Sequence, residues 1–331
     1  MKITDLLAKL AKSTPNYQKE QTTLQNCPRE LKAAIEQNKP ALVHAQYQNE
    51  SCLAVVMASL NKRKAEVIKA KPAKSSGSLT VLGFGIKFIS HLTPETTAFM
   101  EGADKVLYLL NDPVAKDWVQ NNIHNAESLD PFYQHHPLRH DNYWAIAEHI
   151  VETVQQGLNV CVLVYGHPAI LAEPGLIAVE QAKKLGLKAK ILPGISAEDC
   201  LFADLEINPG SCGCQSFQAD DLLVYERPVS AASHLVLWQI GCIGSLGDVE
   251  EHNNAVGIRL LTDYLAKQYP SDHKVILYEA SQYTCFQPRT EMVLLKDLPQ
   301  AKISSISTLY VPPAIQLQAN AFTLQALGIK L

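Results

Sequence analysis

Residues 160–168 read VCVLVYGHP, and residues 188–198 read KAKILPGISAE. Each stretch is a short apolar run that ends in a turn with glycine and proline, which is typical of a buried strand followed by a loop. Between them, residues 174–185 have the length and spacing of a helix. A strand, a helix and a second strand in this order indicate parallel strands joined by a crossover. The sequence therefore predicts an α/β fold around this region.

The same alternation extends toward the N-terminus as far as residue 78. Apolar strands are predicted over residues 79–83 and 105–110, and a helix over residues 142–154. Near-continuous apolar strands are typical of a mostly parallel sheet that helices cover on both faces. We therefore predict a first α/β lobe over residues 78–196.

The alternation starts again after Gly194, with glycine-containing and acidic loops between the apolar runs. Four further strands are predicted, over residues 222–225, 234–238, 274–278 and 307–311. These elements indicate a second α/β lobe over residues 197–331.

The first part of the chain has a different pattern. Residues 1–60 contain short amphipathic stretches, which predict a small helical module with little core of its own. The module ends in an apolar segment, residues 52–58, that helical periodicity does not explain. Residues 61–77 are basic, small and polar, with proline and glycine near their end, which is the composition of a linker.

The overall composition narrows the class of protein. The chain has 331 residues, 47% of them hydrophobic, and a formal net charge of -4. This charge provides no attraction to nucleic acid or to an anionic membrane. No stretch reaches the roughly 18 apolar residues of a membrane span, and the start lacks the apolar core of a secretory signal. A cytoplasmic globular protein is therefore expected.

Three loops at predicted strand ends are candidates for ligand binding: Gly83-Phe84-Gly85, Gly166-His167-Pro168 and residues 193–197. Ligands of open parallel sheets gather at the carboxyl ends of the strands, and glycine lets a backbone approach them closely. Each loop also has a purely structural explanation. The first is a common turn, His167 suits a hydrogen-bonded structural role, and Ser196 suits a helix cap.

Taken together and in this order, the three loops resemble those of the tetrapyrrole (corrin and porphyrin) methylases. The resemblance covers residues 78 to about 314 and implies the two-lobed tetrapyrrole-methylase fold. It also implies S-adenosylmethionine as the methyl donor, with S-adenosylhomocysteine as its product. The donor-binding residues that the resemblance implies are Leu82, Gly83, Gly85, Leu110, Asn111, Asp112, His167, Ser196 and Ala197.

Within this superfamily the chain is most similar to the borosin peptide-backbone α-N-methyltransferases. Stretches that carry this likeness are residues 165–168, 193–198, 203–205, 208–210, 215–217, 237–240, 306–309 and 312–314. The catalytic pattern of that family, a tyrosine before an Arg-x-x-x-Tyr helix, falls on Tyr133, Arg139 and Tyr143, and a further tyrosine falls on Tyr165. Members of this family are typically dimers, so the resemblance implies a homodimer. No metal is expected, because the sulfonium donor is intrinsically reactive.

The N-terminal module fits this resemblance by its arrangement. A borosin precursor combines a small helical module with a hydrophobic segment that receives the methyl groups, and here the two would be fused ahead of the enzyme. The residues expected to be modified are Leu53, Ala54, Val55, Val56 and Met57. The linker is long enough for delivery in cis or to a partner subunit in trans.

Two alternatives stay open at this point. Residues 1–60 also suit an oligomerisation arm. In that case the enzyme would methylate a tetrapyrrole or another small molecule, although the catalytic region is not notably basic. The chain could instead be a non-catalytic scaffold that binds a peptide.

The residue types suit amide methylation. An amide nitrogen is a poor nucleophile because its lone pair is delocalised into the carbonyl group. Its N–H proton must leave, and the developing charge on the oxygen must be stabilised. We therefore expect Tyr143 or Tyr133 to act as the base, with help from Arg139, and Tyr165 to donate a hydrogen bond to the oxygen.

Overall fold

The computed structural model describes residues 77–134, 136, 138–245 and 255–330. The predicted helical module (1–60), its segment 52–58 and the linker up to residue 76 lie outside the described residues. The described chain falls into two units. Residues 94–104, with helix α6 (Pro94–Gly102), belong to one unit, and all other described residues form the other.

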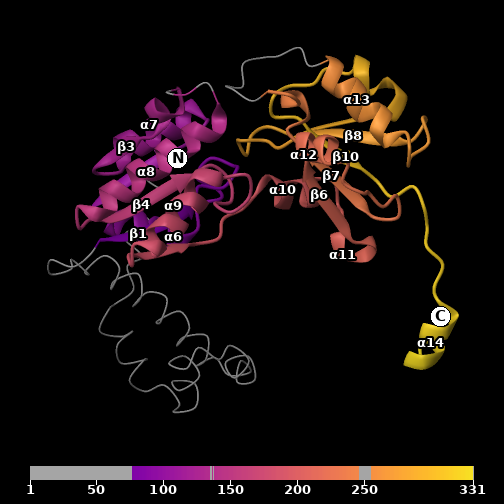
Figure 1. Cartoon of the computed structure of the whole chain (residues 1–331), viewed down its shortest axis with the longest axis horizontal. Helices are drawn as coiled ribbons and strands as arrows, with labels where there is room; N and C mark the ends of the chain where they lie inside the picture. Colours follow the sequence, from indigo (N-terminus) through magenta and orange to yellow (C-terminus); the bar gives the residue numbers. More distant parts are fainter. Residues whose placement is uncertain (1–76, 135, 137, 246–254, 331) are drawn as a thin grey trace. The chain divides into compact units, whose positions relative to one another are not determined.

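A five-stranded, fully parallel sheet occupies the first half of the larger unit (Figure 1). Its strands are β1 (Ser78–Gly83), β2 (Lys105–Leu109), β3 (Ala126–Ser128), β4 (Asn159–Val164) and β5 (Lys188–Ile191). They lie in the order β3-β2-β4-β1-β5. The parallel sheet and four of its strands confirm the prediction, whereas the three-residue strand β3 was not predicted.

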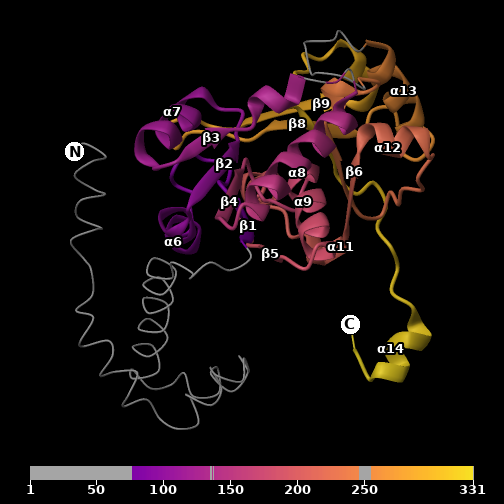
Figure 2. The ribbon, with the colours of Figure 1, turned by 60° about the vertical axis from the view of Figure 1, so that its left-hand side comes forward.

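Helices α8 (Arg139–Gln155) and α9 (Glu173–Lys184) lie side by side (Figure 2). On α8, Ile146, Ile150 and Val154 recur at helical spacing and are fully buried against the strands of the sheet. Both helices confirm the predicted ones. The remaining helical elements of this half are α7 (Pro113–Asn122) and the 3-10 helix η1 (Asp130–Gln134).

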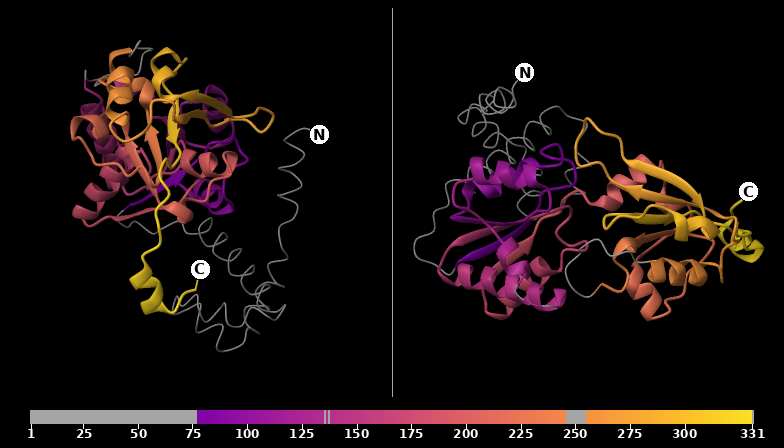
Figure 3. Two further views of the ribbon diagram at one scale, coloured as in Figure 1. Left: turned by 90° about the vertical axis from the view of Figure 1, so that its right-hand side faces the viewer. Right: turned by 90° about the horizontal axis from the view of Figure 1, so that it is seen from above.

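The second half contains a mixed sheet in the order β6-β7-β10-β8-β9. Only β6 and β7 pair in parallel, and β8 and β9 form an antiparallel hairpin, drawn in orange to yellow (Figure 3). The strands are β6 (Cys214–Gln218), β7 (His234–Trp238), β8 (Lys274–Glu279), β9 (Arg289–Leu294) and β10 (Thr308–Val311). The helical elements are α12 (Ala219–Val224), η2 (Ile240–Cys242), α13 (Ala255–Leu265), η3 (Leu295–Gln300) and α14 (Ala321–Leu327).

One predicted strand of this half is wrong. Residues 222–225 form the end of helix α12 and its C-cap. The predicted strands 234–238, 274–278 and 307–311 correspond to β7, β8 and β10.

The segment between the two sheets begins with helix α10 (Ala197–Asp204), followed by α11 (Pro209–Cys212). Ser196 caps α10, because its hydroxyl accepts from the Asp199 amide while the Asp199 carboxylate accepts from the Ser196 amide. The structure therefore confirms the helix-cap role predicted for Ser196. A buried cluster here combines Ile86 from the loop after β1 with Val236 and Tyr310 of the second sheet. Among the described residues, no helix is both long and apolar enough to cross a membrane.

Candidate functional site

The three glycine loops pack directly against one another at the carboxyl ends of the parallel strands. A Cβ atom on Gly83 would lie 2.5 Å from the Gly166 carbonyl oxygen and 2.9 Å from Gly194 Cα. Gly85 and Gly166 exchange two backbone hydrogen bonds, with N···O distances of 3.2 and 3.1 Å. The backbones approach so closely that a side chain at Gly83 has no room. The fold thus brings together motifs that lie far apart in the sequence.

A cavity of about 280 Å³ opens beside these loops. Five residues selected from the sequence line it, namely Asn111, Tyr165, His167, Ser196 and Ala197. The His167 imidazole also shapes its own turn, because Nδ1 accepts a hydrogen bond of 3.0 Å from the Ala169 amide.

The other predicted donor-binding residues are not among the described lining residues. Leu82 and Leu110 are buried, with 0% and 3% of their surface exposed. Gly83 and Gly85 take part in the close backbone packing of the three loops beside the cavity. Asp112 is 6% exposed and caps helix α7.

The Asp112 carboxylate is fully engaged. It accepts from the amides of Val114 and Ala115 at 3.3 and 3.1 Å, which stabilises the first turn of α7. It also accepts a 2.6 Å hydrogen bond from the Tyr283 hydroxyl, and this bond raises the pKa of Tyr283 to about 12. Asp112 therefore ties the loop after β2 to the loop between β8 and β9.

Much of the cavity wall comes from the second sheet and was not predicted as part of the site. Trp238 and Gln239 follow one another at the end of β7, and Gln239 has a left-handed backbone (φ 57°). The Trp238 indole N–H donates to Ser216 Oγ at 2.7 Å, which fixes the ring. Further lining residues from this half are Tyr278, Ala280, Gln282, Ser305, Ile306 and Thr308. The likeness at residues 237–240 and 306–309 was the sequence signal for this wall.

The Tyr165 hydroxyl is suited to donate a hydrogen bond in the cavity. Burial raises the pKa of Tyr165, and a side-chain hydrogen bond with Gln282 opposes that rise. The net effect is a raised pKa, so this phenol keeps its proton at neutral pH.

The predicted catalytic residues before and on α8 are only partly brought together. The hydroxyls of Tyr133 and Tyr143 are 3.3 Å apart, and their ring centroids 5.9 Å apart. The Arg139 guanidinium donates to the Ser245 carbonyl at 3.2 Å. None of these three is among the described residues that line the cavity.

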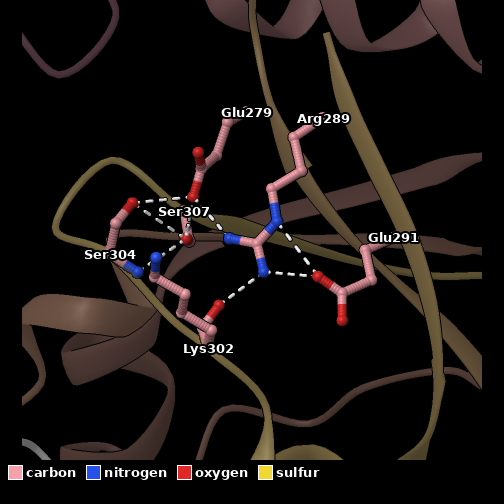
Figure 4. Close-up of polar contacts among 6 residues, drawn as sticks. All are labelled: Glu279, Arg289, Glu291, Lys302, Ser304 and Ser307. Atoms are coloured by element: carbon pink, nitrogen blue, oxygen red, sulfur yellow. Dashed lines mark hydrogen bonds and ion pairs between the residues drawn. The ribbon is translucent and has the colours of Figure 1, made fainter.

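A polar network holds one wall of the cavity in place (Figure 4). One carboxylate oxygen of Glu279 accepts from Ser304 Oγ at 2.7 Å, Ser307 Oγ at 2.5 Å and Arg289 Nη1 at 2.8 Å. Burial would raise the pKa of Glu279, but the hydrogen bonds from Ser307, Ser304 and Arg289 outweigh it and hold the pKa below its usual value. Because Ser305 and Ile306 lie between the two serines, the network fixes cavity-lining residues.

Residues 78–280 match the sequence model of the family described as Tetrapyrrole (Corrin/Porphyrin) Methylases. A curated relative from Gymnopus fusipes, described as a methyltransferase/ribosomally synthesized cyclic peptide gymnopeptides precursor, is 39% identical over 252 residues. That match covers 74% of this chain and 60% of the relative. A methyltransferase/type I borosin cyclic peptide precursor from Coprinopsis marcescibilis is 36% identical, over 77% of this chain and 67% of the relative.

The chain thus spans about 60% of the length of the first of these relatives. Among solved structures, the uroporphyrin-III-C-methyltransferase of Thermus thermophilus has a TM-score of 0.53. It is 17% identical and is matched over all of its length and 75% of this chain. This likeness supports the fold assignment.

Proposed function

The chain belongs to the tetrapyrrole (corrin/porphyrin) methylase family, and we propose that it transfers methyl groups from S-adenosylmethionine to backbone amide nitrogens of a peptide. The names of the similar relatives, which combine a methyltransferase with a cyclic peptide precursor, support this proposal. The observation that carries it is the position of Tyr165, whose pKa burial raises, in a cavity beside the glycine loops typical of the family.

The cavity lining fits an adenosyl group with an amino acid tail. It combines apolar surface from Ile86, Ile170 and Trp238 with polar side chains of Asn111, Ser196 and Gln239. Cofactor sites commonly have this mixture of apolar walls and a few polar groups. When bound, S-adenosylmethionine supplies an electrophilic methyl group on a sulfonium ion, and no metal is needed to activate it.

The proposed reaction exchanges one bond for another at the amide nitrogen. The nitrogen forms a bond to the methyl carbon, the bond from that carbon to sulfur breaks, and the sulfonium becomes a neutral thioether. The N–H proton passes to a base. Tyr165 donates a hydrogen bond to the carbonyl oxygen, where negative charge develops, and keeps its own proton.

We propose the hydrogen-bonded pair of Tyr133 and Tyr143 as the source of the base. Tyr133 donates to the Tyr143 oxygen, so Tyr143 is the acceptor of the pair. Tyr133 is then in position to stabilise the Tyr143 oxygen. Arg139 is the first residue of α8, the helix that carries Tyr143, and lies one turn before it.

The proposed substrate is the chain's own segment 52–58, with Leu53, Ala54, Val55, Val56 and Met57 as the modified residues. This segment lies outside the described residues, and its support is the order of module, apolar segment and linker in the sequence. Delivery in cis or from a partner subunit fits the length of residues 61–77. A cytoplasmic location is part of the same proposal.

We further propose a homodimer. Beyond the second sheet, the C-terminal residues expose large apolar side chains: Leu317 is 75%, Phe322 80% and Leu327 67% exposed. A seven-residue helix such as α14 is too short to be stable in water by itself. A second copy that covers these side chains would stabilise it.

The test is the mass of the full chain after incubation with S-adenosylmethionine, followed by tandem mass spectrometry. We expect increments of one CH₂ on backbone nitrogens between Cys52 and Ala58, lost in Tyr143→Phe. The matched control is Tyr225→Phe, because Tyr225 is 69% exposed on the second half and outside the cavity lining. Donor binding with an unchanged mass would overturn self-methylation and direct the search to a separate peptide or a tetrapyrrole.

A further inference from the structure

The loop between β8 and β9, residues 280–288, contributes Ala280 and Gln282 to the wall of the cavity. Gln282 is followed by Tyr283, whose hydroxyl donates to the Asp112 carboxylate at 2.6 Å. Asp112 in turn follows Asn111, a cavity-lining residue of the loop after β2. Each partner of this hydrogen bond therefore comes directly after a residue of the cavity wall.

We propose that Tyr283 is a positioning residue of the donor site. It acts through Asp112 and clasps the two loops together, so that Asn111 and Gln282 stay in the cavity wall when S-adenosylmethionine binds. This inference rests on the donor-binding part of the proposed function. It assigns Asp112 to holding the wall, in place of the direct donor contact that its position in the sequence implies.

The turn that carries Tyr283 is shaped by a serine of the same loop. Ser281 is 7% exposed, and its Oγ donates to the Tyr283 carbonyl at 2.7 Å and accepts from the Tyr283 amide at 3.3 Å. The serine therefore holds both polar groups of the Tyr283 backbone. Between these two residues, the Gln282 carbonyl accepts a 2.8 Å hydrogen bond from the amide of Phe88, which lies in the loop after β1.

Aromatic packing directs the ring of Tyr283. Its centroid is 6.4 Å from that of Phe88 and 6.2 Å from that of Phe286. Phe88 in turn packs on Phe84 and Trp118, at centroid distances of 6.2 and 6.3 Å. Phe84 is 2% exposed and belongs to the first glycine loop. The ring is thus braced against the loop after β1.

The acceptor of the clasp is fixed as well. Asp112 is 6% exposed, and its carboxylate caps α7 by accepting from the amides of Val114 and Ala115. Because this carboxylate cannot turn away without uncapping the helix, a hydrogen bond to it constrains the loop that donates it. Hydrogen bonds to a carboxylate are about twice as strong as those between neutral groups.

The stem of the loop is held by a separate contact. Glu279 and Arg289 face one another in register on β8 and β9, and a 2.8 Å ion pair joins them (Figure 4). Residues 284–287, beyond the clasp, are exposed. Loss of the clasp therefore loosens the tip of the loop and leaves its stem folded.

The clasp has an energetic consequence for donor binding. A wall that is ordered before the donor arrives lowers the cost of binding, because the entropy of ordering is not lost at that step. Without the clasp, the tip samples positions in which Gln282 leaves the wall. The apparent affinity then falls with the fraction of molecules that keep the binding-competent arrangement.

Tyr283→Phe is the most direct test, because it removes the hydroxyl and keeps the ring. We expect the Kd of the full chain for S-adenosylhomocysteine, measured by calorimetry, to rise about tenfold, the size of one lost hydrogen bond. The donor concentration at half-maximal rate of methyl incorporation should rise by the same factor. The rate at saturating donor should stay within about twofold, because Tyr283 is not among the described lining residues.

Tyr264 provides the matched control. It is half-buried like Tyr283, and its hydroxyl also donates a 2.6 Å hydrogen bond, to the Arg227 carbonyl. It is not among the described residues that line the cavity. Tyr264→Phe removes the same group from another part of the second half, so its Kd for S-adenosylhomocysteine should match that of the wild type within about twofold.

A double-mutant cycle shows whether Tyr283 acts through Asp112. Asp112→Ser keeps a residue that caps helices well but removes the carboxylate that Tyr283 contacts. Tyr283→Phe should weaken S-adenosylhomocysteine binding about tenfold in the wild type and have no effect in the Asp112→Ser background. Thermal unfolding without ligand checks that each variant folds. If Asp112→Ser does not fold, the comparison of Tyr283→Phe with Tyr264→Phe still decides.

The outcomes distinguish the clasp from the proposed function. A wild type that binds no S-adenosylhomocysteine defeats both. A wild type that binds it but methylates no peptide defeats peptide methylation alone, and the two tyrosine variants then judge the clasp by affinity. Equal affinities for these two variants, additive effects in the cycle, or a lower saturating rate with an unchanged Kd in Tyr283→Phe overturn the clasp and leave the proposed function standing.

Discussion

At the scale of single residues, one carboxylate oxygen of Glu279 holds three neighbouring side chains by hydrogen bonds. It accepts from Ser304, Ser307 and Arg289, and its side chain is 18% exposed. Glu279→Ala would leave the partly buried guanidinium without this partner, so we expect a loss of about 2–4 kcal/mol in the free energy of unfolding. Chemical denaturation measures it.

Glu291 provides the matched control for this prediction. It also pairs with Arg289, but its side chain is 47% exposed, so water screens the interaction. Glu291→Gln should cost less than about 1 kcal/mol. Equal losses in the two variants would show that the network does not depend on the buried oxygen.

His91 predicts a dependence of stability on pH. Its Nδ1 accepts from the amides of Ile86 and Lys87, both at 3.2 Å, which requires a neutral ring. Burial, and next the charge of Lys87, lower its pKa below the usual 6.5. Because the unfolded chain binds this proton more readily, stability is lost as the pH falls below about 6.5.

The measurement is the Tm of wild type and His91→Gln between neutral and mildly acidic pH. The wild type should lose more of its Tm on acidification than the variant. Parallel curves would assign the loss to other groups, such as His234, whose pKa burial also lowers.

The residues of the site differ in how far sequence could predict them. Tyr165, His167 and Ser196 could be found because they follow apolar strands, and the carboxyl ends of parallel strands meet at one edge of a sheet. Gln282 and Tyr278 could not. They reach the cavity through the antiparallel pairing of the second sheet, which no local sequence pattern predicts.

At the scale of elements, the glycine loops predict unequal costs for the same substitution. In Gly83→Ala the new methyl group would meet backbone atoms of Gly166 and Gly194, which cannot rotate away. We expect it to destabilise the protein by about 2 kcal/mol or more and to weaken donor binding. Calorimetry with S-adenosylhomocysteine and chemical denaturation test both effects.

Gly186 provides the control for the steric cost of the Gly83→Ala substitution. It has a left-handed backbone (φ 74°) but nothing within 4 Å of an added Cβ. Gly186→Ala should therefore cost about 1 kcal/mol from the backbone alone and leave donor affinity unchanged. Similar donor affinities for the two variants would contradict a role of the Gly83 packing in the cavity.

The elements themselves show where local patterns are insufficient. The apolar run 222–225 was interpreted as a strand, but Asp220 and Asp221 precede it and favour a helix start, so α12 forms. Strands β6 and β9 were missed because they lie at the two edges of the second sheet and are mostly half-buried or exposed. These two strands lack the continuous apolar run that identified β1 and β4.

At the scale of the whole molecule, the exposed C-terminal residues predict the effect of a truncation. Among the described residues, Ile315 is the last one bonded to the second sheet region, through its amide and the Ala231 carbonyl at 3.1 Å. Removal of residues 316–331 deletes Leu317, Phe322 and Leu327 and should convert a dimer to a monomer, as measured by light scattering. A variant in which these three residues are replaced by Ser controls for chain length. If light scattering still gives the molar mass of a dimer for both variants, the subunit contact lies elsewhere.

The paired hydrogen bonds between Gly85 and Gly166 have a consequence for hydrogen exchange. Each amide proton is bonded to the other residue's carbonyl oxygen, so neither can exchange with solvent until the two loops separate. The two amides therefore report a single opening event and should exchange at rates governed by one equilibrium constant. Any ligand that holds the loops together would slow both by the same factor, which gives a readout of occupancy that requires no catalytic turnover.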